Sequence, residues 1–226
     1  MGSPASEVDR GSDEQQHRVQ LTKGFCVMET EVTQGMWESL GMKNRSKFKK
    51  CGSSCPVEMV SWLDAVKYAN AVSEREGLTA VYQVQGDSVS EVSGASGYRL
   101  LTEAEWEAAA RGREGFVYAG SDDLSAVGWT AANSGKKTHP VKGLSPNGYG
   151  LYDMSGNVWE WTWDWYAESY GGGVQTDPHG PVSGSFRVMR GGSWDLTPAY
   201  ARVANRIWNN PFRRSNFGFR LARTAP

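Results

Sequence analysis

The C-terminal half of the chain lacks a helical period, and this constrains the fold more than any other feature. From Gly112 onward, Gly, Pro, Asn and aromatic residues dominate, and they favour turns, short strands and anchored loops. Within this half, the segment 159–165 reads WEWTWDW, so that every second residue is Trp. This alternation predicts an extended strand whose four indoles point to one side. A stripe of this kind is more often core than binding site, and we expect it to be core.

Capping patterns predict two main helices ahead of this irregular half. Ser61 and Asp64 form an N-terminal cap for apolar residues that repeat at helical spacing. Thr102 and Glu105 match a capping box for a second helix, which continues to Gly112. Two helices followed by an irregular half indicate an α+β domain that is rich in loops and has short antiparallel strands.

Shorter elements and a tail complete the predicted organisation. Residues 1–18 are polar and contain few apolar side chains, which predicts a disordered tail in front of one domain at 19–226. Apolar and β-branched stretches predict strands within 19–33, and Gly- and Ser-rich turns predict a hairpin within 82–97. A short helix is expected after Thr33.

Charge and hydropathy exclude two classes of partner. The formal net charge is −1, so the bulk charge gives no reason to expect binding to nucleic acid or to an anionic membrane surface. No stretch of the sequence reaches the roughly 18 apolar residues that a membrane span requires. The first residues also lack the apolar region of a signal peptide.

Cys26, Cys51 and Cys55 are the three cysteines of the chain. The spacing of Cys51 and Cys55 allows a small local disulfide in an oxidising compartment, or two free thiols. Two thiols cannot complete a structural zinc site, which almost always uses four protein ligands. Cys26 lies in an apolar run and is expected to be a buried thiol.

Six motifs spread over almost the whole chain carry a resemblance to a known family. They are ETEVT at 29–33, PVEMVSW at 56–62, YRLLTEAEW at 98–106, NGYGLYDMSGNVWEW at 147–161, RGGSW at 190–194 and GFRLA at 218–222. One motif alone would be weak, but the ordered set resembles the formylglycine-generating-enzyme (sulfatase-modifying factor) family. The resemblance implies a variant of the C-type lectin fold.

The residues that carry catalysis in this family are absent here. Formylglycine-generating enzymes bind copper and oxidise a substrate cysteine with two thiols, two and seven residues after the aromatic residue of the Gly-Gly-Ser-aromatic motif. Counted from Trp194, these positions hold Leu196 and Ala201, which can neither coordinate a soft metal nor form a thiolate. We therefore predict no copper and no catalytic residue. The three histidines show no clustering in sequence that would favour iron chemistry instead.

A calcium site of the family matches position by position. The resemblance implies side-chain oxygens from Asp153 and Glu160 and backbone carbonyl oxygens from Gly156 and Val158. Calcium prefers hard oxygen ligands of this mixed type, so we expect one structural Ca²⁺. The alternative is that both carboxylates accept hydrogen bonds from backbone amides and no ion binds.

Residues 195–217 lie between the motifs RGGSW and GFRLA. In proteins of this fold, diversity-generating retroelements place their mutated region here and randomise the adenines of Asn codons, which cannot yield Lys, Glu, Gln or Met. These four types supply 38 of the 226 residues, so a window of this length should hold roughly four, and it holds none. Trp208 departs from the pattern because Asn codons cannot reach Trp, so either Trp208 is framework or the retroelement idea is wrong.

The make-up of the segment 195–217 predicts a ligand-binding surface. Its aromatic residues offer rigid contact area, its arginines offer charge, and its Asn and Ser residues adapt. The predicted contact residues are Asp195, Leu196, Thr197, Tyr200, Ile207, Trp208, Phe212, Arg213, Arg214, Ser215 and Phe217. No acidic residue follows Asp195, whereas six arginines do, so an acidic protein surface is the expected ligand. In the alternative view, the aromatics pack inward and the arginines pair with Glu or Asp elsewhere.

These features favour a non-catalytic ligand-binding protein that displays a variable C-terminal surface at 195–217, diversified by a retroelement, with a protein as its ligand. One alternative is a metal-dependent oxidase with altered chemistry, and another is an accessory module of a larger surface or signalling protein. A diversified binder would favour an exported or surface-exposed location. The sequence leaves the location and the oligomeric state open.

Overall fold

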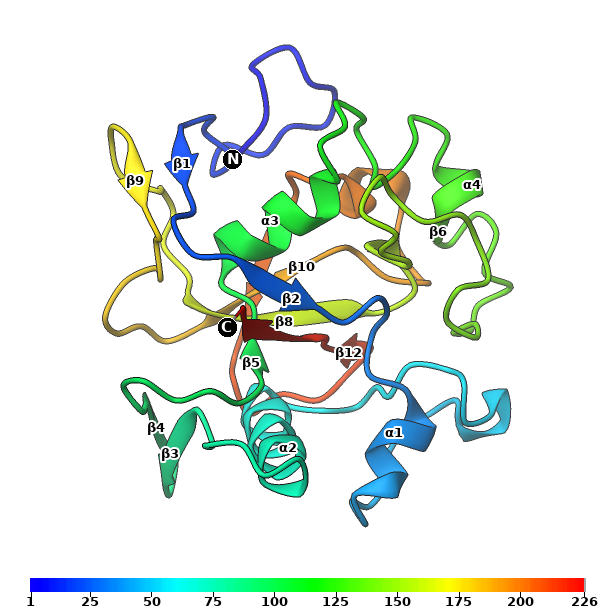
Figure 1. Ribbon diagram of the computed structural model, residues 1–226. Coiled ribbons are helices and arrows are strands. Elements are labelled where there is room, and N and C mark those ends of the chain that lie inside the picture. The colour runs from blue at the N-terminus through cyan, green and yellow to red at the C-terminus, as the bar shows by residue number, and fades with distance from the viewer. Residues whose placement is uncertain (226) are drawn as a thin grey trace.

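The C-terminal half of the chain contributes the strands of a four-stranded sheet (Figure 1). The computed structural model describes residues 1–225. The strand β8 (Trp159–Trp165) pairs antiparallel with β10 (Arg187–Arg190) and parallel with β12 (Phe217–Gly218). On the other side of β10 lies β11 (Arg206–Asn209), again antiparallel. The alternating Trp segment is therefore an inner strand of this sheet.

Smaller sheets connect distant parts of the chain. A three-stranded sheet places β13 (Leu221–Thr224) between β2 (Phe25–Val27) and β5 (Arg99–Leu100), so that the two ends of the domain pair with each other. The two-stranded pairs are β1 (Val19–Gln20) with β9 (Gln175–Thr176), β3 (Tyr82–Gln85) with β4 (Ser88–Glu91), and β6 (Gly128–Trp129) with β7 (Ser155–Gly156). The predicted hairpin is confirmed as β3–β4. The pairs β1–β9, β6–β7 and β8–β12 are parallel, which the expectation of antiparallel strands did not include.

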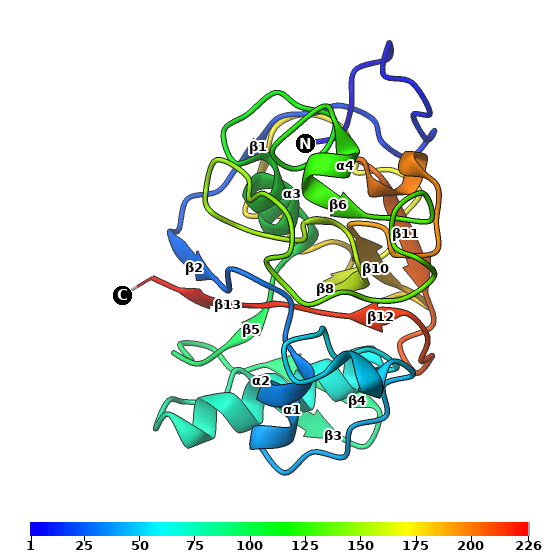
Figure 2. The same ribbon diagram turned by 90° about the vertical axis from the view of Figure 1, so that its right-hand side faces the viewer.

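Helices lie on both sides of these strands. The elements are α1 (Gln34–Ser39), α2 (Trp62–Arg75), α3 (Glu103–Arg111) and α4 (Leu124–Val127), with 3-10 turns η1 (Lys49–Cys51) and η2 (Pro198–Ala201). Figures 1 and 2 show α3 on one side of β8 and β12, and α1 and α2 on the other side. The α+β class with two main helices is thus confirmed.

Both predicted capping boxes are present. The hydroxyl of Ser61 accepts from the amide of Asp64 at 3.1 Å, and the carboxylate of Asp64 accepts from the amide of Ser61 at 2.9 Å. Thr102 and Glu105 make the same reciprocal pair at 3.2 and 2.9 Å. Gly112 then ends α3 with a φ of 53°, in the left-handed region that glycine adopts without a Cβ penalty.

The alternation predicted the four indoles of β8 as core, and this is confirmed for Trp159 and Trp161, whereas Trp163 and Trp165 are only partly buried. Trp163 stacks on Tyr82 with ring centroids 4.9 Å apart and contacts Trp62 at 5.3 Å. Aromatic side chains from β8, β3 and α2 therefore hold the sheet against the helix.

Residues 1–18 lie against the domain in the structure, which corrects the expectation of a disordered tail. Ser3 and Glu14 are fully buried. Glu14 forms a two-pronged ion pair with Arg202, with nitrogen–oxygen distances of 2.6 and 2.8 Å, and Glu7 contacts the same guanidinium at 2.6 Å. Composition could not indicate this order, because the segment is held by ion pairs with a residue almost 200 positions away and not by apolar contacts.

Cys26 is exposed on β2, which corrects the expectation of a buried thiol. β2 lies at the edge of its three-stranded sheet, next to β13. Its neighbours Phe25 and Val27 are partly buried and pack against the second hydrophobic cluster. In a strand the side chains alternate, so burying Phe25 and Val27 turns Cys26 outward.

Candidate functional site

The segment 195–217 lies along one side of the molecule, where Figure 2 shows η2, β11 and the chain that leads to β12. In the ladder with β10, Ile207 is opposite Met189 and Trp208 is opposite Val188. Since side chains alternate along a strand, Ile207 packs against the core while Trp208 faces solvent. The edge position of β11 thus presents part of the segment outward.

The predicted contact residues divide into three groups by exposure. The exposed group is Asp195, Thr197, Tyr200, Trp208, Phe212, Arg213 and Arg214, and the partly buried group is Leu196, Ile207 and Ser215, while Phe217 is buried. Three large aromatic side chains stand in the exposed group, with exposed fractions of 41% for Tyr200, 45% for Trp208 and 47% for Phe212. Large exposed aromatics in one short segment are typical of protein-binding surfaces.

Phe217 is wrong as a contact residue. It is 4% exposed and packs edge-on against Trp161, with ring centroids 5.3 Å apart. Its strand β12 lies at the edge of the four-stranded sheet and pairs with the inner strand β8. Phe217 is therefore part of the hydrophobic core, and the surface segment ends before it.

Three of the six C-terminal arginines are also interior, which corrects the expectation that all of them create a basic surface. Each pairs with a buried glutamate: Arg202 with Glu14 at 2.6 Å, Arg206 with Glu103 at 2.7 Å and Arg220 with Glu160 at 2.7 Å. For these three, the alternative of pairing elsewhere in the chain is confirmed. Arg214 also pairs with an acidic residue, Asp64, but it stays exposed, as does Arg213.

The glutamates of α3 have structural partners. Glu103 accepts hydrogen bonds from Arg206 at 2.7 and 2.8 Å, Glu105 pairs with Arg99, and Glu107 pairs with Arg111 and Arg190. Sequence analysis assigned one of these carboxylates, Glu105, to the capping box. It missed the buried ion pairs because their partners lie far along the chain.

The two positions that correspond to the catalytic thiols hold apolar side chains in packed surroundings. Leu196 packs against the main hydrophobic cluster, and Ala201 is buried at the end of η2. Trp194, just before them, contacts Phe48 edge-on at 5.1 Å. The surroundings of these positions thus provide no thiol to bind a soft metal.

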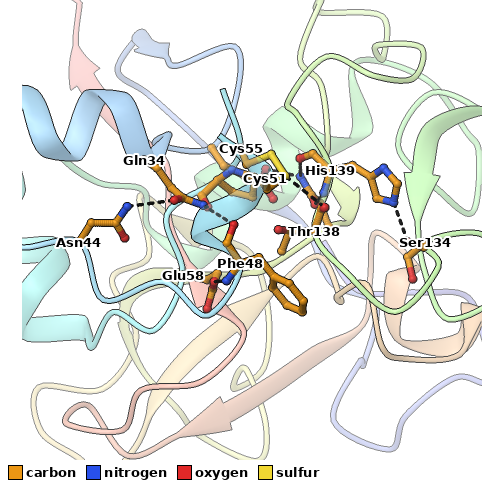
Figure 3. The surroundings of a disulfide bond; sticks show 12 residues. Gln34, Asn44, Phe48, Cys51, Cys55, Glu58, Ser134, Thr138 and His139 are labelled. Carbon is orange, nitrogen blue, oxygen red and sulfur yellow. Dashed lines mark hydrogen bonds between the residues drawn. A yellow bond between two sulfur atoms is a disulfide. The ribbon is translucent and has the colours of Figure 1, made fainter. Parts of the chain in front are cut away.

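A disulfide between Cys51 and Cys55 lies next to the segment that carries Phe48 (Figure 3). The amide of Phe48 donates to the carboxylate of Glu58 at 2.8 Å, and Gln34 donates to the carbonyl oxygen of Phe48 at 3.3 Å. The loop 51–55 that the disulfide closes is held by the amides of Gln34 and Gly35, which donate to the carbonyl oxygens of Cys55 at 2.8 Å and of Ser53 at 2.9 Å. Of the two alternatives for this cysteine pair, the structure contains the bonded one.

The expected calcium ligands take part in other contacts of the structure. Asp153 is buried and accepts a hydrogen bond from the backbone amide of Lys142 at 2.9 Å. A Cβ on Gly156 would meet the carbonyl oxygen of Trp129 at 2.2 Å, so glycine is required there. The amide of Val158 donates to a carboxylate that the sequence did not indicate, that of the buried Glu31, at 3.1 Å.

Glu160 is the expected calcium ligand that does not fit. Arg220 donates to both of its carboxylate oxygens, and the indole of Trp106 donates to one of them at 2.8 Å. With its lone pairs in use, Glu160 serves as the partner of Arg220.

Asp153 and Glu31 fit a cation better than Glu160 does. Burial raises the pKa of Asp153 to about 6 and raises the pKa of Glu31 well above its usual range, and the charges of Asp153 and Glu160 add to the rise at Glu31. Desolvation is the main cause of both shifts, and the charge of Arg220 offsets it only in part. Within residues 1–225, however, no group of three or more His, Cys, Asp or Glu is arranged to hold a metal. Of the expected donor set, Asp153 is thus the side chain that keeps a carboxylate without an ion pair.

No helix among residues 1–225 is long and apolar enough to cross a membrane.

Comparison with known proteins identifies the family. A model described as "Sulfatase-modifying factor enzyme 1-like domain" matches residues 1–225. The formylglycine-generating enzyme of Streptomyces coelicolor is 40% identical over 190 residues, which cover 75% of this chain and 53% of that protein. The chain thus spans about half the length of that enzyme. Chaperone protein LppX of Paenibacillus barcinonensis is 35% identical over 205 residues, covering 75% of this chain and 69% of that protein.

A solved structure extends the likeness to the whole fold. Treponema denticola variable protein 1 is 35% identical, superposes with a TM-score of 0.89, and the match covers 100% of this chain and 92% of that one. The ordered motifs, the loop-rich α+β architecture and these matches agree with one another. The chain therefore belongs to the sulfatase-modifying factor enzyme 1-like family and has the C-type-lectin-like fold of formylglycine-generating enzymes.

Proposed function

We propose that the protein is a non-catalytic binding module that contacts a protein ligand through the exposed side chains of 195–217. The observation that carries this proposal is the exposure of Tyr200, Trp208 and Phe212 in one segment that the core anchors through Leu196, Ile207 and Phe217. Aromatic side chains with few rotatable bonds lose little conformational entropy on binding, and they dominate the energetics of many interfaces. Nothing at Leu196 or Ala201 supplies the thiols that the family's oxidases use.

Diversification of this surface by a retroelement is part of the proposal. Its support is the lack of Lys, Glu, Gln and Met in 195–217, together with the likeness to a protein called variable protein 1. The segment also divides into exposed side chains, which can vary at little cost to stability, and buried ones such as Arg206 and Phe217, which cannot. Trp208 is exposed but lies beyond the reach of Asn codons, so it belongs to the constant part of the surface.

Sequences of sibling copies of the gene test the diversification. We expect amino-acid differences to concentrate at exposed positions of 195–217, such as Thr197, Tyr200 and Phe212, and to spare Arg206 and Phe217. Differences spread evenly over 19–224 would overturn this part of the proposal and leave the binding surface itself to be tested separately.

Quantitative affinity capture tests the binding surface. Wild-type protein, Trp208→Ala, Phe212→Ala and a control, Tyr149→Ala, are used as baits in lysate of the producing cells. Tyr149 is 49% exposed and lies outside the segment. A specific partner should lose at least about tenfold in enrichment with the first two variants and be unchanged with the control. A partner that is equally sensitive to Tyr149→Ala, or insensitive to all three, would contradict the assignment.

A single calcium ion near Asp153 and an oxidising, exported or surface-exposed location complete the proposal. The location is supported by the Cys51–Cys55 disulfide, since such bonds persist mainly outside the reducing cytosol. A second candidate function, an oxidase with altered chemistry, draws support only from the family relation to formylglycine-generating enzymes.

A further inference from the structure

Arg187, on β10, carries a buried guanidinium that lies between two indole rings. It is 4% exposed, and its central carbon lies 3.8 Å from the ring centroid of Trp62 and 3.5 Å from that of Trp165. One terminal nitrogen donates to the carbonyl oxygen of Trp163. The Nε nitrogen is buried and has no hydrogen-bond partner among residues 1–225. The cation is thus held by aromatic faces and keeps unused hydrogen-bonding capacity.

The other buried arginines of the chain are treated differently. Arg190, Arg202, Arg206 and Arg220 each contact a buried glutamate at 2.5 to 2.7 Å. Arg187 has no such ion pair within the described part of the chain, and burial lowers its pKa to about 9. It therefore stays charged at neutral pH. The charge of the buried Asp164 favours the cation without forming a direct ion pair, so a carboxylate that reaches the guanidinium would supply the direct partner that it lacks.

A cavity of about 340 Å³ lies beside this guanidinium. Trp62, Trp165 and Arg187 line it from the framework, whereas Asn210 and Phe212 line it from the segment 195–217. The cavity thus joins the unpaired charge to the proposed binding surface.

We propose that this cavity, the Arg187 pocket, binds a carboxylate group of the protein ligand, supplied by an Asp or Glu side chain or by a chain terminus. This inference rests on the proposed binding function of 195–217 and specifies what the partner must present. A guanidinium offers two parallel N–H donors to a planar carboxylate, and the indole walls reduce the competition from water. Variation at Asn210 and Phe212 would change the entrance while the charge at the base stays constant.

Asp87 is the acidic side chain that lines the same cavity, and it is exposed. Its negative charge at the entrance opposes a ligand carboxylate. Replacing it with Asn removes this repulsion, so Asp87→Asn should bind carboxylates more tightly than the wild type. This variant lies in an exposed turn and is not expected to disturb folding.

The test uses three blocked tripeptides as probes. Acetyl-Ala-Glu-Ala-amide carries a side-chain carboxylate, acetyl-Ala-Ala-Ala with a free C-terminus carries a terminal one, and acetyl-Ala-Gln-Ala-amide carries none. Binding is followed by the NMR signals of the Trp62 and Trp165 indole N–H groups, with ¹⁵N-labelled protein and peptide at up to about 10 mM. We expect at least one carboxylate probe to shift these signals in a saturable way and to bind about tenfold more tightly than the Gln probe. The carboxylate probe that binds more tightly shows whether the ligand supplies a side-chain or a terminal carboxylate.

Two variants sharpen the result. Arg187→Gln should abolish the difference between the Glu and Gln probes, and Asp87→Asn should enlarge it. If Arg187→Gln does not fold, the comparison of probes on the wild type still decides. Equal shifts with all three probes, or no saturable shift with any, would overturn the Arg187 pocket. Such a failure leaves the role of Trp208 untouched, because the capture experiment tests that role independently.

Discussion

Two phenylalanines five positions apart allow a matched test of where the framework ends within the segment 195–217. Phe217 is 4% exposed and contacts Trp161 edge-on, whereas Phe212 is 47% exposed beside the Arg187 pocket. Replacing each with Ala removes the same atoms from opposite surroundings. Any difference in stability between the two variants therefore reports burial alone.

The expected magnitudes differ widely. Truncating a buried Phe to Ala costs about 3–5 kcal/mol in the free energy of unfolding, and each kcal/mol lowers Tm by about 2–4 °C in a domain of this size. Phe217→Ala should therefore lower Tm by roughly 6–20 °C. Phe212→Ala should change the free energy of unfolding by at most about 1 kcal/mol, because nearly half of its surface is already in water.

Thermal unfolding followed by circular dichroism, with the disulfide intact, measures both variants against the wild type. Denaturation in guanidinium chloride, followed by Trp fluorescence, provides an independent value. If Phe212→Ala destabilised the protein as much as Phe217→Ala, the division of this segment into constant core and variable surface would be refuted.

Three further predictions concern the ion pairs, the calcium site and the disulfide. Glu14→Gln should lower the free energy of unfolding by about 3 kcal/mol and expose residues 1–18 to proteolysis, because it leaves Arg202 with an incomplete set of buried partners. Burial by itself would raise the pKa of Glu14, but hydrogen bonds from Arg202 and Ser3 outweigh it and lower this pKa. The stability that the ion pair contributes is therefore present above the pKa of the unfolded chain and is lost as the pH falls. In a pH series of Tm, Glu14→Gln should lack this fall of Tm at acidic pH. The pKa of Asp153 is raised to about 6, so its ionisation costs stability as the pH rises through that value. Asp153→Ala, measured in EDTA, should lack this loss of stability. Millimolar CaCl₂ should raise the Tm of the wild type but not that of Asp153→Ala, and equal responses of the two proteins would exclude a calcium ion there. Replacing Cys51 and Cys55 together with Ala should cost about 2 kcal/mol, since the closed loop is short, and a loss above about 4 kcal/mol in denaturant unfolding would contradict this.

Local sequence patterns predicted the helices and the strand that are determined by interactions between residues close in sequence. Ser61 and Thr102 each cap a helix through a carboxylate three residues on, so α2 and α3 could be placed from the sequence. The alternating Trp residues of β8 likewise predicted a strand and its burial. Each of these signals is complete within a few residues.

Contacts between distant residues could not be predicted in the same way. The order of residues 1–18 depends on Arg202, and the burial of Arg206 depends on Glu103. In sequence, these arginines look the same as the exposed Arg213. Phe217 likewise looks like a surface aromatic until its strand is paired with β8.

The candidate site was therefore predicted as a region but not residue by residue. Exposure bears out Tyr200, Trp208 and Phe212 as surface residues and removes Phe217. The sequence did not indicate Arg187 as a binding residue, because its surroundings are formed by the indoles of Trp62 and Trp165, which lie far apart in the sequence.

The most direct test of the proposed non-catalytic function uses the purified protein with copper(I), oxygen and a cysteine-containing sulfatase peptide. Leu196 and Ala201 stand where the oxidases of the family have thiols, so we predict no stoichiometric copper binding and no peptide aldehyde by mass spectrometry. One equivalent of tightly held copper together with conversion of the cysteine to its aldehyde would contradict the proposal that this chain is a binding module.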